Sequence, residues 1–370
     1  MCDSVSTPRF TVFFVVLCLF FAGPSQAVSP ESPEGSIPSL VESVRFSQPL
    51  FFCDDKLPLD VFDVRERLEK EFLIALWDRP QVILWLKRAS RYFPHIESVL
   101  KQEGLPDDIK YLAVIESGLR PHAGSSMGAI GFWQFLRSTG RNHGLRVDTD
   151  VDERRNIYTS TTAACQYLKN LKERFGSWSL AAAAYNMGEN GLASEIKTQG
   201  PLDYYSLYLP LETQRYVFKI VAAKEILKHP ERYGFNLIAS DYYPEMTFDR
   251  VELTAGSEVP VAVVARAAQT TFKNIKDLNP EIRGDYVAMG KRSILIPKGG
   301  AKGFDGRFAR LFKTWKMSNG TGVHVVKKGE NLSAIAQRYQ MSLGMLLRLN
   351  RLNLKSAIHP GDRLKVDSKL

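Results

Sequence analysis

The residue best suited to do chemistry in this 370-residue chain is a glutamate within an apolar stretch. Glu116 follows the apolar run from Leu112 to Ile115, and the spacing of apolar residues predicts a helix over 107–117. A carboxyl group set among apolar side chains loses solvent, which raises its pKa and leaves it protonated near neutral pH. Glu116 is therefore a candidate general acid.

A glycine-rich aromatic segment, Ser126–Phe135, follows Glu116 within 20 residues. Its glycines let the backbone approach a ligand closely. Ser126 and Gln134 are candidate substrate contacts, because the Gln134 amide stands between aromatic residues and needs a polar partner. Ser117 either fixes the Glu116 carboxylate, contacts substrate or only caps the next turn. We expect at least two of the three aromatic residues to be core: Phe132, Trp133 and Phe135.

Two further pairs of residues extend this candidate site. Tyr185 and Asn186 follow a run of four alanines, 181–184, which can pack tightly. Their polar ends are therefore predicted to reach the floor of a cleft. Glu212 and Tyr216 are four residues apart and share one helical face, which allows both to line the same cleft. Glu212 is also the candidate for a second carboxylate.

Helical segments must position these residues, because the pattern from 60 to 233 has apolar residues at three- and four-residue spacing. Glycines 104, 144 and 176 mark helix ends. We therefore predict an all-helical domain over 60–235, within an α+β multidomain chain. The predicted helices are 61–77, 80–92, 96–102, 107–117, 132–143, 159–175, 179–187 and 212–227.

After residue 233, short β-rich runs bracket short helices, and the sequence echoes itself at an offset of 71 residues. The echo aligns Ile275, Asn279 and Gly290 with Leu346, Asn350 and Gly361. Two small modules of one kind are predicted, the first over 246–298 and the second over 322–367. Residues 299–321 form a linker helix between them.

The start of the chain predicts export. Residues 1–27 have a lone Arg9, an apolar core and small residues at Ser25 and Ala27, which is the pattern of a cleavable signal peptide. Residues preceding Cys18 do not favour lipid attachment, so we expect a protein of the periplasm or cell envelope that is not lipid-anchored. Residues 28–59 are predicted to be a linker, of which the first part is rich in Pro, Ser and Glu.

Charge and cysteine content limit the partners. The formal net charge is +9, and residues 301–370 alone have a net charge of +10. This predicts an anionic partner for that end or only a solvated basic surface, and export argues against nucleic acid. Cys53 and Cys165 are left after the signal peptide; a disulfide between them stays open, and two unrelated buried thiols is the preferred interpretation. No residues have metal-ligand spacing, so neither a metal nor a cofactor is expected.

The second module has a recognisable sequence. Val323-His-Val-Val-Lys-Lys-Gly-Glu-Asn-Leu-Ser-Ala-Ile-Ala, Leu346-Leu-Arg-Leu-Asn350 and Ile358-His-Pro-Gly-Asp-Arg-Leu364 resemble a LysM domain. The resemblance implies a βααβ fold that binds glycans containing N-acetylglucosamine. The first module resembles a degenerate LysM copy.

The helical domain resembles the lysozyme-like lytic transglycosylases of glycoside hydrolase family 23, and with the LysM arrangement it is similar to the membrane-bound lytic transglycosylase D type. Four ordered motifs carry this resemblance: Glu116-Ser117, Ser126-x-Gly-Ala-x-Gly-x-Trp-Gln-Phe135, Ala184-Tyr-Asn-Met-Gly188 and Leu211-Glu-Thr-x-x-Tyr-Val217.

The resemblance implies a reaction on peptidoglycan strands. Glu116 as acid protonates the oxygen between N-acetylmuramate and N-acetylglucosamine, then as base takes a proton from the C6 hydroxyl, which attacks C1. A 1,6-anhydro ring results and no water is consumed. Three alternatives stay open: a hydrolytic muramidase on the same fold, a non-catalytic wall-binding scaffold and, least favoured, an enzyme that cleaves chitin.

An aromatic row beside basic residues, Phe304 to Trp315, has helical spacing. Such a row is compatible with a membrane-surface helix. A short linker helix docked on its neighbours is the preferred interpretation, so membrane association stays open.

Overall fold

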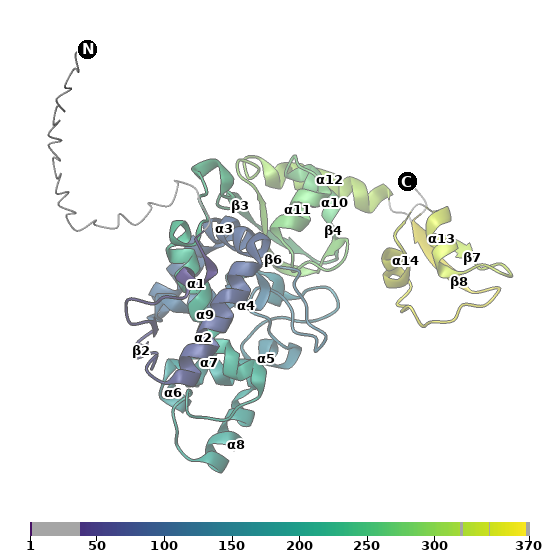
Figure 1. The fold of residues 1–370 in the computed structure, drawn as a ribbon. Coiled ribbons are helices and arrows are strands. Elements are labelled where there is room, and N and C mark those ends of the chain that lie inside the picture. Colours follow the sequence, from purple (N-terminus) through teal and green to yellow (C-terminus); the bar gives the residue numbers. More distant parts are fainter. Residues whose placement is uncertain (2–37, 319–320, 340, 368–370) are drawn as a thin grey trace. The chain divides into compact units, whose positions relative to one another are not determined.

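The computed structural model describes residues 38–318, 321–339 and 341–367, together with Met1. The predicted signal peptide, with Cys18, therefore lies outside the described residues. The described chain begins with a mostly helical domain and continues into two small modules that contain strands (Figure 1).

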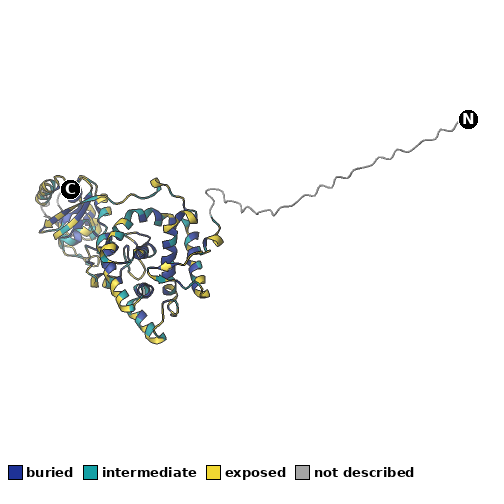
Figure 2. Ribbon diagram, turned by 90° about the vertical axis from the view of Figure 1, so that its left-hand side faces the viewer, coloured by how far each residue is buried: buried dark blue, intermediate teal, exposed yellow. Residues whose placement is uncertain are grey.

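Helices of the first domain form around one hydrophobic core, and Figure 2 shows their inner faces as buried. α9 is central, since it packs against α2, α4 and α7. The α-helices are α1 (Leu40–Ser43), α2 (Phe62–Trp77), α3 (Arg79–Glu103), α4 (Lys110–Ser117), α5 (Arg137–Asn142), α6 (Ile157–Phe175), α7 (Trp178–Met187), α8 (Glu189–Gln199) and α9 (Leu211–Lys228), with short 3₁₀ helices η1 (Asp107–Ile109) and η2 (Glu153–Arg155).

Local signals explain most of these boundaries. Asn156 and Ser177 accept hydrogen bonds from the first amides of α6 and α7. Gly104 and Gly176 end α3 and α6 in the left-handed conformation. Three helices differ from the prediction: α3 is one helix that includes Pro94, only 137–142 of the predicted helix 132–143 is helical, and α8 was not predicted.

The predicted linker 28–59 is a folded part of the domain over its described second half. Strands β1 (Phe51–Phe52) and β2 (Asp55–Lys56) form a short antiparallel hairpin, so the domain is not all-helical. Leu50, Phe52 and Leu57 are buried in the helical core. Burial of these three side chains, which sequence composition does not reveal, attaches the segment to the domain.

An ion pair fixes this hairpin. Asp108 Oδ2 accepts hydrogen bonds from Lys224 Nζ at 2.6 Å and from the Cys53 amide at 2.7 Å. Lys224 also donates to the carbonyl oxygen of Phe51 at 2.9 Å. Both charged residues are buried, so each depends on the other to balance its charge.

We expect Asp108→Ala to lower the free energy of unfolding by about 3–5 kcal/mol, because it leaves the Lys224 charge buried without its partner. Urea denaturation measures this. Asp107→Ala is the matched control. Asp107 is the neighbouring residue and also forms an ion pair, with Lys110, but its own side chain is exposed. The control variant is expected to lose about 0–1 kcal/mol. Equal losses in the two variants would contradict the prediction.

The cysteines of the described chain are both free. Cys165 lies fully buried in α6, and burial raises its pKa to about 12. Burial also raises the pKa of Cys53 well above its ordinary value. Two protonated, unpaired thiols agree with the interpretation as unrelated residues.

The two modules have the same order of elements. In the first, β3 (Phe248–Ala255) pairs antiparallel with β6 (Gly290–Pro297), and α10 (Val261–Ala267) and α11 (Phe272–Leu278) lie between them in sequence. In the second, β7 (Thr321–Val325) pairs with β8 (Arg363–Asp367) around α13 (Leu332–Arg338) and α14 (Leu343–Leu349). The first also has the short pair β4 (Val259–Pro260) and β5 (Tyr286–Val287).

An asparagine performs the same task in both modules. Asn279 donates to the carbonyl oxygens of Ile275 and Leu295 and accepts from the Leu295 amide. Asn350 makes the equivalent three bonds with Leu346 and Lys365. Both asparagines thus join the end of the second helix to the last strand. The 71-residue sequence repeat therefore corresponds to a structural repeat.

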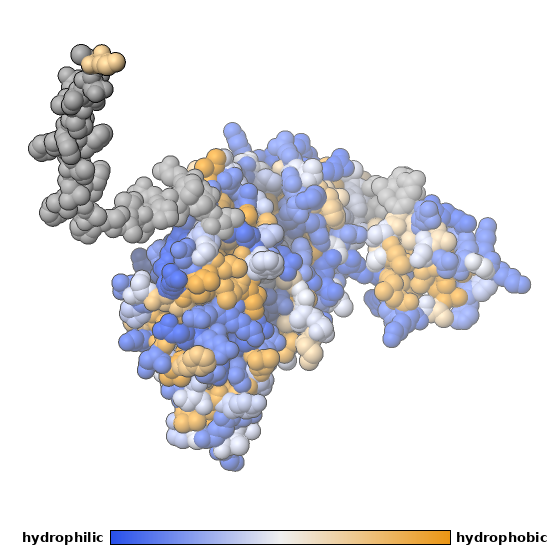
Figure 3. Space-filling view, viewed as in Figure 1, coloured by the Kyte–Doolittle hydropathy of each residue, from blue (hydrophilic) through white to orange (hydrophobic). Residues whose placement is uncertain are grey.

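α12 (Phe304–Ser318) follows the first module and packs against it. Phe304 is buried in the core of that module, and Phe308, Leu311 and Phe312 pack on it. The aromatic row is thus turned towards protein, as the linker-helix interpretation predicts. In the second module Val323, Val325 and Leu354 are exposed, and Figure 3 shows apolar surface there among charged residues.

Candidate active site

Glu116 lies in the last turn of α4. The helix ends because Gly118 adopts the left-handed conformation, with φ 58°, and donates to the carbonyl oxygen of Val114 at 2.8 Å. A Cβ atom at position 118 would lie 2.8 Å from Gln81 Nε2 on α3. Close packing of α3 against this turn therefore sets where the Glu116 carboxyl emerges.

The environment of Glu116 raises the pKa of its carboxyl, so that protonated and ionised forms coexist near neutral pH. Burial is the largest effect and raises the pKa of its carboxyl to about 7. A hydrogen bond from Tyr216 and the charge of Lys219 lower this pKa, and the charge of Glu212 raises it. The Tyr216 hydroxyl donates to Glu116 Oε1 at 2.5 Å. These contacts leave the carboxyl able to give up and regain a proton near pH 7.

Tyr216→Phe is expected to shift the pH dependence of activity. Loss of the hydrogen bond removes an interaction that favours the carboxylate, so the pKa of Glu116 rises by about one unit above its value near 7. The alkaline limb of the activity profile then moves upward by about one pH unit, which initial rates between pH 5 and 9 would measure.

Tyr204→Phe serves as the control for that experiment. Tyr204 is also buried, but its hydroxyl donates to the carbonyl oxygens of Thr213 and Gln214 instead of a carboxylate. This variant is expected to keep the alkaline limb in place. An unchanged limb in Tyr216→Phe would mean that the hydrogen bond does not set the pKa of Glu116.

The glycine-rich segment is a series of turns, not the start of a helix. Gly131 has φ 87° and donates to the carbonyl oxygen of Ala123 at 2.9 Å. Gln134 also has positive φ, at 47°, and its side chain donates to the carbonyl oxygens of Gly131 and Ala123 at 2.8 and 3.2 Å. The partner of this amide group is therefore its own loop. We predicted that Gln134 contacts a sugar. The structure corrects this for the amide nitrogen, which donates its hydrogen bonds within the loop.

All three aromatic residues of this segment are buried core residues, which confirms the expectation for at least two. Trp133 Nε1 donates to Thr161 Oγ1 on α6 at 3.1 Å. The rings thus anchor the loop on the domain, and they are not available to stack on a ligand.

Ser117 is a positioning residue. Its side chain is 3% exposed, and its hydroxyl lies 2.8 Å from the carbonyl oxygen of Phe132 and 3.0 Å from that of Ala113. It fastens the glycine-rich segment to α4 next to Glu116. The prediction that it contacts substrate is therefore corrected, because its hydroxyl is enclosed by protein. Ser126, in contrast, is exposed on the same segment.

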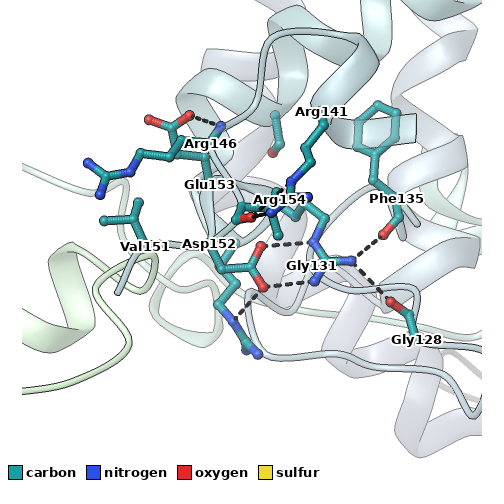
Figure 4. A network of polar contacts seen from close by, with 12 residues as sticks. Gly128, Gly131, Phe135, Arg141, Arg146, Val151, Asp152, Glu153 and Arg154 are labelled. Atoms are coloured by element: carbon teal, nitrogen blue, oxygen red, sulfur yellow. Dashed lines mark hydrogen bonds and ion pairs between the residues drawn. The ribbon is translucent and has the colours of Figure 1, made fainter. Parts of the chain in front are cut away.

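A buried ion pair supports the glycine-rich segment from behind (Figure 4). Arg154 donates to the carbonyl oxygens of Gly128 and Phe135 at 3.0 and 2.9 Å. The same guanidinium makes a bidentate pair with Asp152 at 2.8 and 2.9 Å. Sequence reasoning missed these residues, although charged residues two apart in a short turn are a signal worth testing for such a pair.

The remaining predicted residues come from α7 and α9. Tyr185 donates to the carbonyl oxygen of Trp133 at 2.6 Å, and Asn186 accepts from Thr213 Oγ1 at 2.8 Å. Burial first and the charge of Glu116 second raise the pKa of Tyr185 well above its ordinary value. Tyr185 is thus a neighbour of Glu116, and it holds the glycine-rich loop.

Glu212 and Tyr216 differ in their surroundings although they share a helix. Tyr216 is buried against Glu116, whereas the Glu212 side chain is 75% exposed and lies 3.7 Å from Lys219 Nζ. The structure therefore brings together Glu116, Tyr185 and Tyr216, with Glu212 and Lys219 at the rim. Lys219 was not predicted as a site residue.

The fold and site define a helical, lysozyme-like domain that has one carboxylic acid near neutral pKa behind a glycine-rich loop. Comparison with known families agrees: residues 94–207 match the Transglycosylase SLT domain family and residues 324–367 match the LysM domain family. This chain therefore carries a transglycosylase SLT domain followed by a LysM domain.

Individual relatives extend the comparison. The chain is 35% identical over 293 residues to the membrane-bound lytic murein transglycosylase D of Escherichia coli strain K12, covering 75% of this chain and 64% of that protein. It is 38% identical over 104 residues to the peptidoglycan transglycosylase gp16 of Escherichia phage T7, covering 27% of this chain and 8% of that protein. The chain thus spans less than two thirds of the length of either relative.

Among solved structures, the 70 kDa soluble lytic transglycosylase of Escherichia coli matches 51% of this chain and 32% of its own, at 18% identity and a TM-score of 0.33.

Proposed function

We propose that this chain is a peptidoglycan lytic transglycosylase that cleaves the bond between N-acetylmuramate and N-acetylglucosamine. The observation that carries the proposal is the Glu116 carboxyl, whose pKa is raised to about 7 by burial and which accepts a hydrogen bond from Tyr216. The SLT domain match over 94–207, which includes Glu116, supports the same reaction class.

Glu116 performs both proton transfers in the proposed reaction. Its protonated carboxyl gives a proton to the glycosidic oxygen as the bond from C1 to that oxygen breaks. The resulting carboxylate then takes the proton of the C6 hydroxyl, whose oxygen attacks C1 and closes a 1,6-anhydro ring. The acid is regenerated, and no water enters the products. A pKa near 7 suits a group that must act as acid and then as base.

The setting of Glu212 favours one carboxylate over two. Glycosidases with two carboxylates place an acid and a base or nucleophile on either side of the scissile bond. Glu212 is exposed and close to Lys219, without the apolar surroundings of Glu116. An internal hydroxyl of the substrate can replace the missing nucleophile. The other residues of the proposed site are the exposed Ser126 and Glu212, the half-buried Tyr185 and Asn186, and the buried Tyr216.

We also propose that the LysM domain holds the enzyme on the glycan. Binding through a second site on the same chain raises the local concentration of substrate at the cleft. The glycan contact is to N-acetylglucosamine units, and the protein acts in the cell envelope after export. No helix among the described residues is long and apolar enough to cross a membrane.

Mass spectrometry of the products tests the proposal. Purified peptidoglycan is incubated with the protein lacking 1–27, and released muropeptides are identified. Anhydromuramoyl ends are the expected result. Reducing muramoyl ends would mean that the domain is a hydrolytic muramidase, and wall binding without any release would mean a scaffold.

A further inference from the structure

A cavity that is partly open to solvent lies away from Glu116, where the helical domain meets the first module. We name it the junction cavity; its volume is about 230 Å³. One wall comes from 151–159, just before and at the start of α6, and the other from the 281–295 loop and strand. Residues with polar or aromatic groups along it include Asn156, Tyr158, Arg250, Glu281, Tyr286 and Arg292.

Backbone hydrogen bonds hold the two walls together. The Asp152 amide donates to the carbonyl oxygen of Glu281 at 2.9 Å, and the Arg283 amide donates to that of Asp150 at 2.9 Å. Val151 and Ile282 form an antiparallel bridge between these bonds. The cavity is therefore a built feature of the chain and does not depend on flexible side chains meeting.

Two buried polar atoms in this cavity have no hydrogen-bond partner among the described residues: Glu281 Oε2 and Arg292 Nε. Glu281 is only 8% exposed. Such atoms are rare in folded proteins because each costs free energy when it is removed from water without a partner. Their occurrence together in one cavity marks a place where water or a ligand supplies the missing bonds.

The polar atoms restrict the chemistry of that ligand. A guanidinium only donates, and a carboxyl accepts or, when protonated, also donates. Burial raises the pKa of Glu281 to about 7, and the nearby Asn156 side chain partly offsets this rise. A hydroxyl group both donates and accepts hydrogen bonds. Two neighbouring hydroxyls on one ligand could therefore bond to Glu281 Oε2 and to Arg292 Nε.

Charged ligands fit less well. An anion attracted to Arg250, Lys291 and Arg292 would face Glu281 and Glu153, and a cation would face the three basic residues. A neutral polyhydroxyl molecule avoids both repulsions.

We propose that the junction cavity is a saccharide-binding site that holds the glycan strand at a position separate from the Glu116 cleft and from the LysM domain. This rests on the proposed function, because the saccharide is taken to be part of the strand that the cleft receives. A strand held there would contact the 151–159 segment. This segment includes Asp152 and Arg154, the ion pair that supports the glycine-rich segment.

Hydrogen exchange measured by mass spectrometry localises binding on the full chain. The probe is the tetramer of N-acetylglucosamine, added to Glu116→Gln protein so that no cleavage occurs. Amides of 151–159 and 281–295 are expected to exchange more slowly with the probe. In Arg292→Ala, and in the nearly isosteric Glu281→Gln, half-maximal protection of these peptides should need at least about 10-fold more saccharide.

Lys302→Ala is the matched control, since it removes an exposed positive charge outside the cavity. It should leave the protection unchanged, and the peptides at 126–135 and 324–367 should respond alike in all variants. An absence of protection at 281–295, or protection that neither cavity variant weakens, would overturn the proposal. Failure of the anhydromuramoyl assay would not alter this readout, so the two proposals can fail separately.

Discussion

Glu116→Gln is expected to lower the rate of anhydromuramoyl release by about 10³-fold or more. General acid–base catalysis by one group contributes about 10²–10⁴-fold, and here the same carboxyl is proposed for both proton transfers. Glutamine keeps the shape and can still receive the Tyr216 hydrogen bond, but it cannot donate and regain a proton. Initial rates of muropeptide release by mass spectrometry measure the effect.

Glu212→Gln is the matched control for this variant. Glu212 is exposed and near Lys219, so its loss is expected to reduce the rate by less than about 10-fold, through the charge it places near Glu116. A loss in Glu212→Gln as large as that in Glu116→Gln would contradict the one-carboxylate mechanism and favour a pair of carboxylates.

The stability of Glu116→Gln provides the check that the variant is folded. The folded pKa of Glu116, about 7, is raised above its ordinary value of 4.5. Its contribution to stability is therefore fully present below about pH 4.5 and is lost as the pH rises through about 7. The variant lacks this loss, so in urea denaturation it should match the native protein at pH 4 and be the more stable of the two at pH 8.

Gly131→Ala is expected to have the largest effect on the architecture of the site. A Cβ atom at this position would lie 1.8 Å from the carbonyl oxygen of Arg154, and φ is 87°. The obstacle is backbone, so no side-chain rotation relieves it. We expect a loss of about 3 kcal/mol or more in the free energy of unfolding and at least about 100-fold in activity, because the loop must move away from Arg154.

Gly128→Ala separates the effect of the steric clash from the effect of the left-handed backbone conformation. Gly128 also has positive φ, at 80°, but a Cβ atom there would meet nothing within 4 Å. This variant bears only the cost of the left-handed conformation, about 1–2 kcal/mol. Thermal or urea unfolding compares the variants. If Gly131→Ala were no less stable than Gly128→Ala, the loop could separate from Arg154 without cost.

Much of the framework was predictable because it depends on neighbours in sequence. The apolar spacing around Glu116 predicted its helix and its raised pKa, and glycines 104 and 176 predicted the ends of two helices. The 71-residue repeat predicted two modules, and Asn279 and Asn350 make the same bonds within each. Periodicity and caps act over a few residues, so the sequence contains them directly.

Local pattern misled where tertiary contacts set the backbone. The aromatic spacing of 132–143 suggests a helix, but the turns at Gly131 and Gln134 prevent one over its first five residues. The linker reading of 50–57 failed because its burial depends on Asp108 and Lys224, which lie 55 or more residues further along the chain.

By itself, the sequence predicted Glu116 as the acid candidate, most of the helical segments and the repeat of two small modules after the helical domain. Only the tertiary structure decided which polar groups are exposed and which are enclosed by protein. Tyr216 donates a hydrogen bond to Glu116, which lies 100 residues earlier in the chain. Ser117 and Gln134 donate to carbonyl oxygens of the glycine-rich segment. Arg154 donates to another carbonyl oxygen of the same segment. These outcomes depend on how α4, α7 and α9 pack, because a hydrogen bond requires atoms to meet within about 3 Å, and spacing along the chain does not specify that meeting.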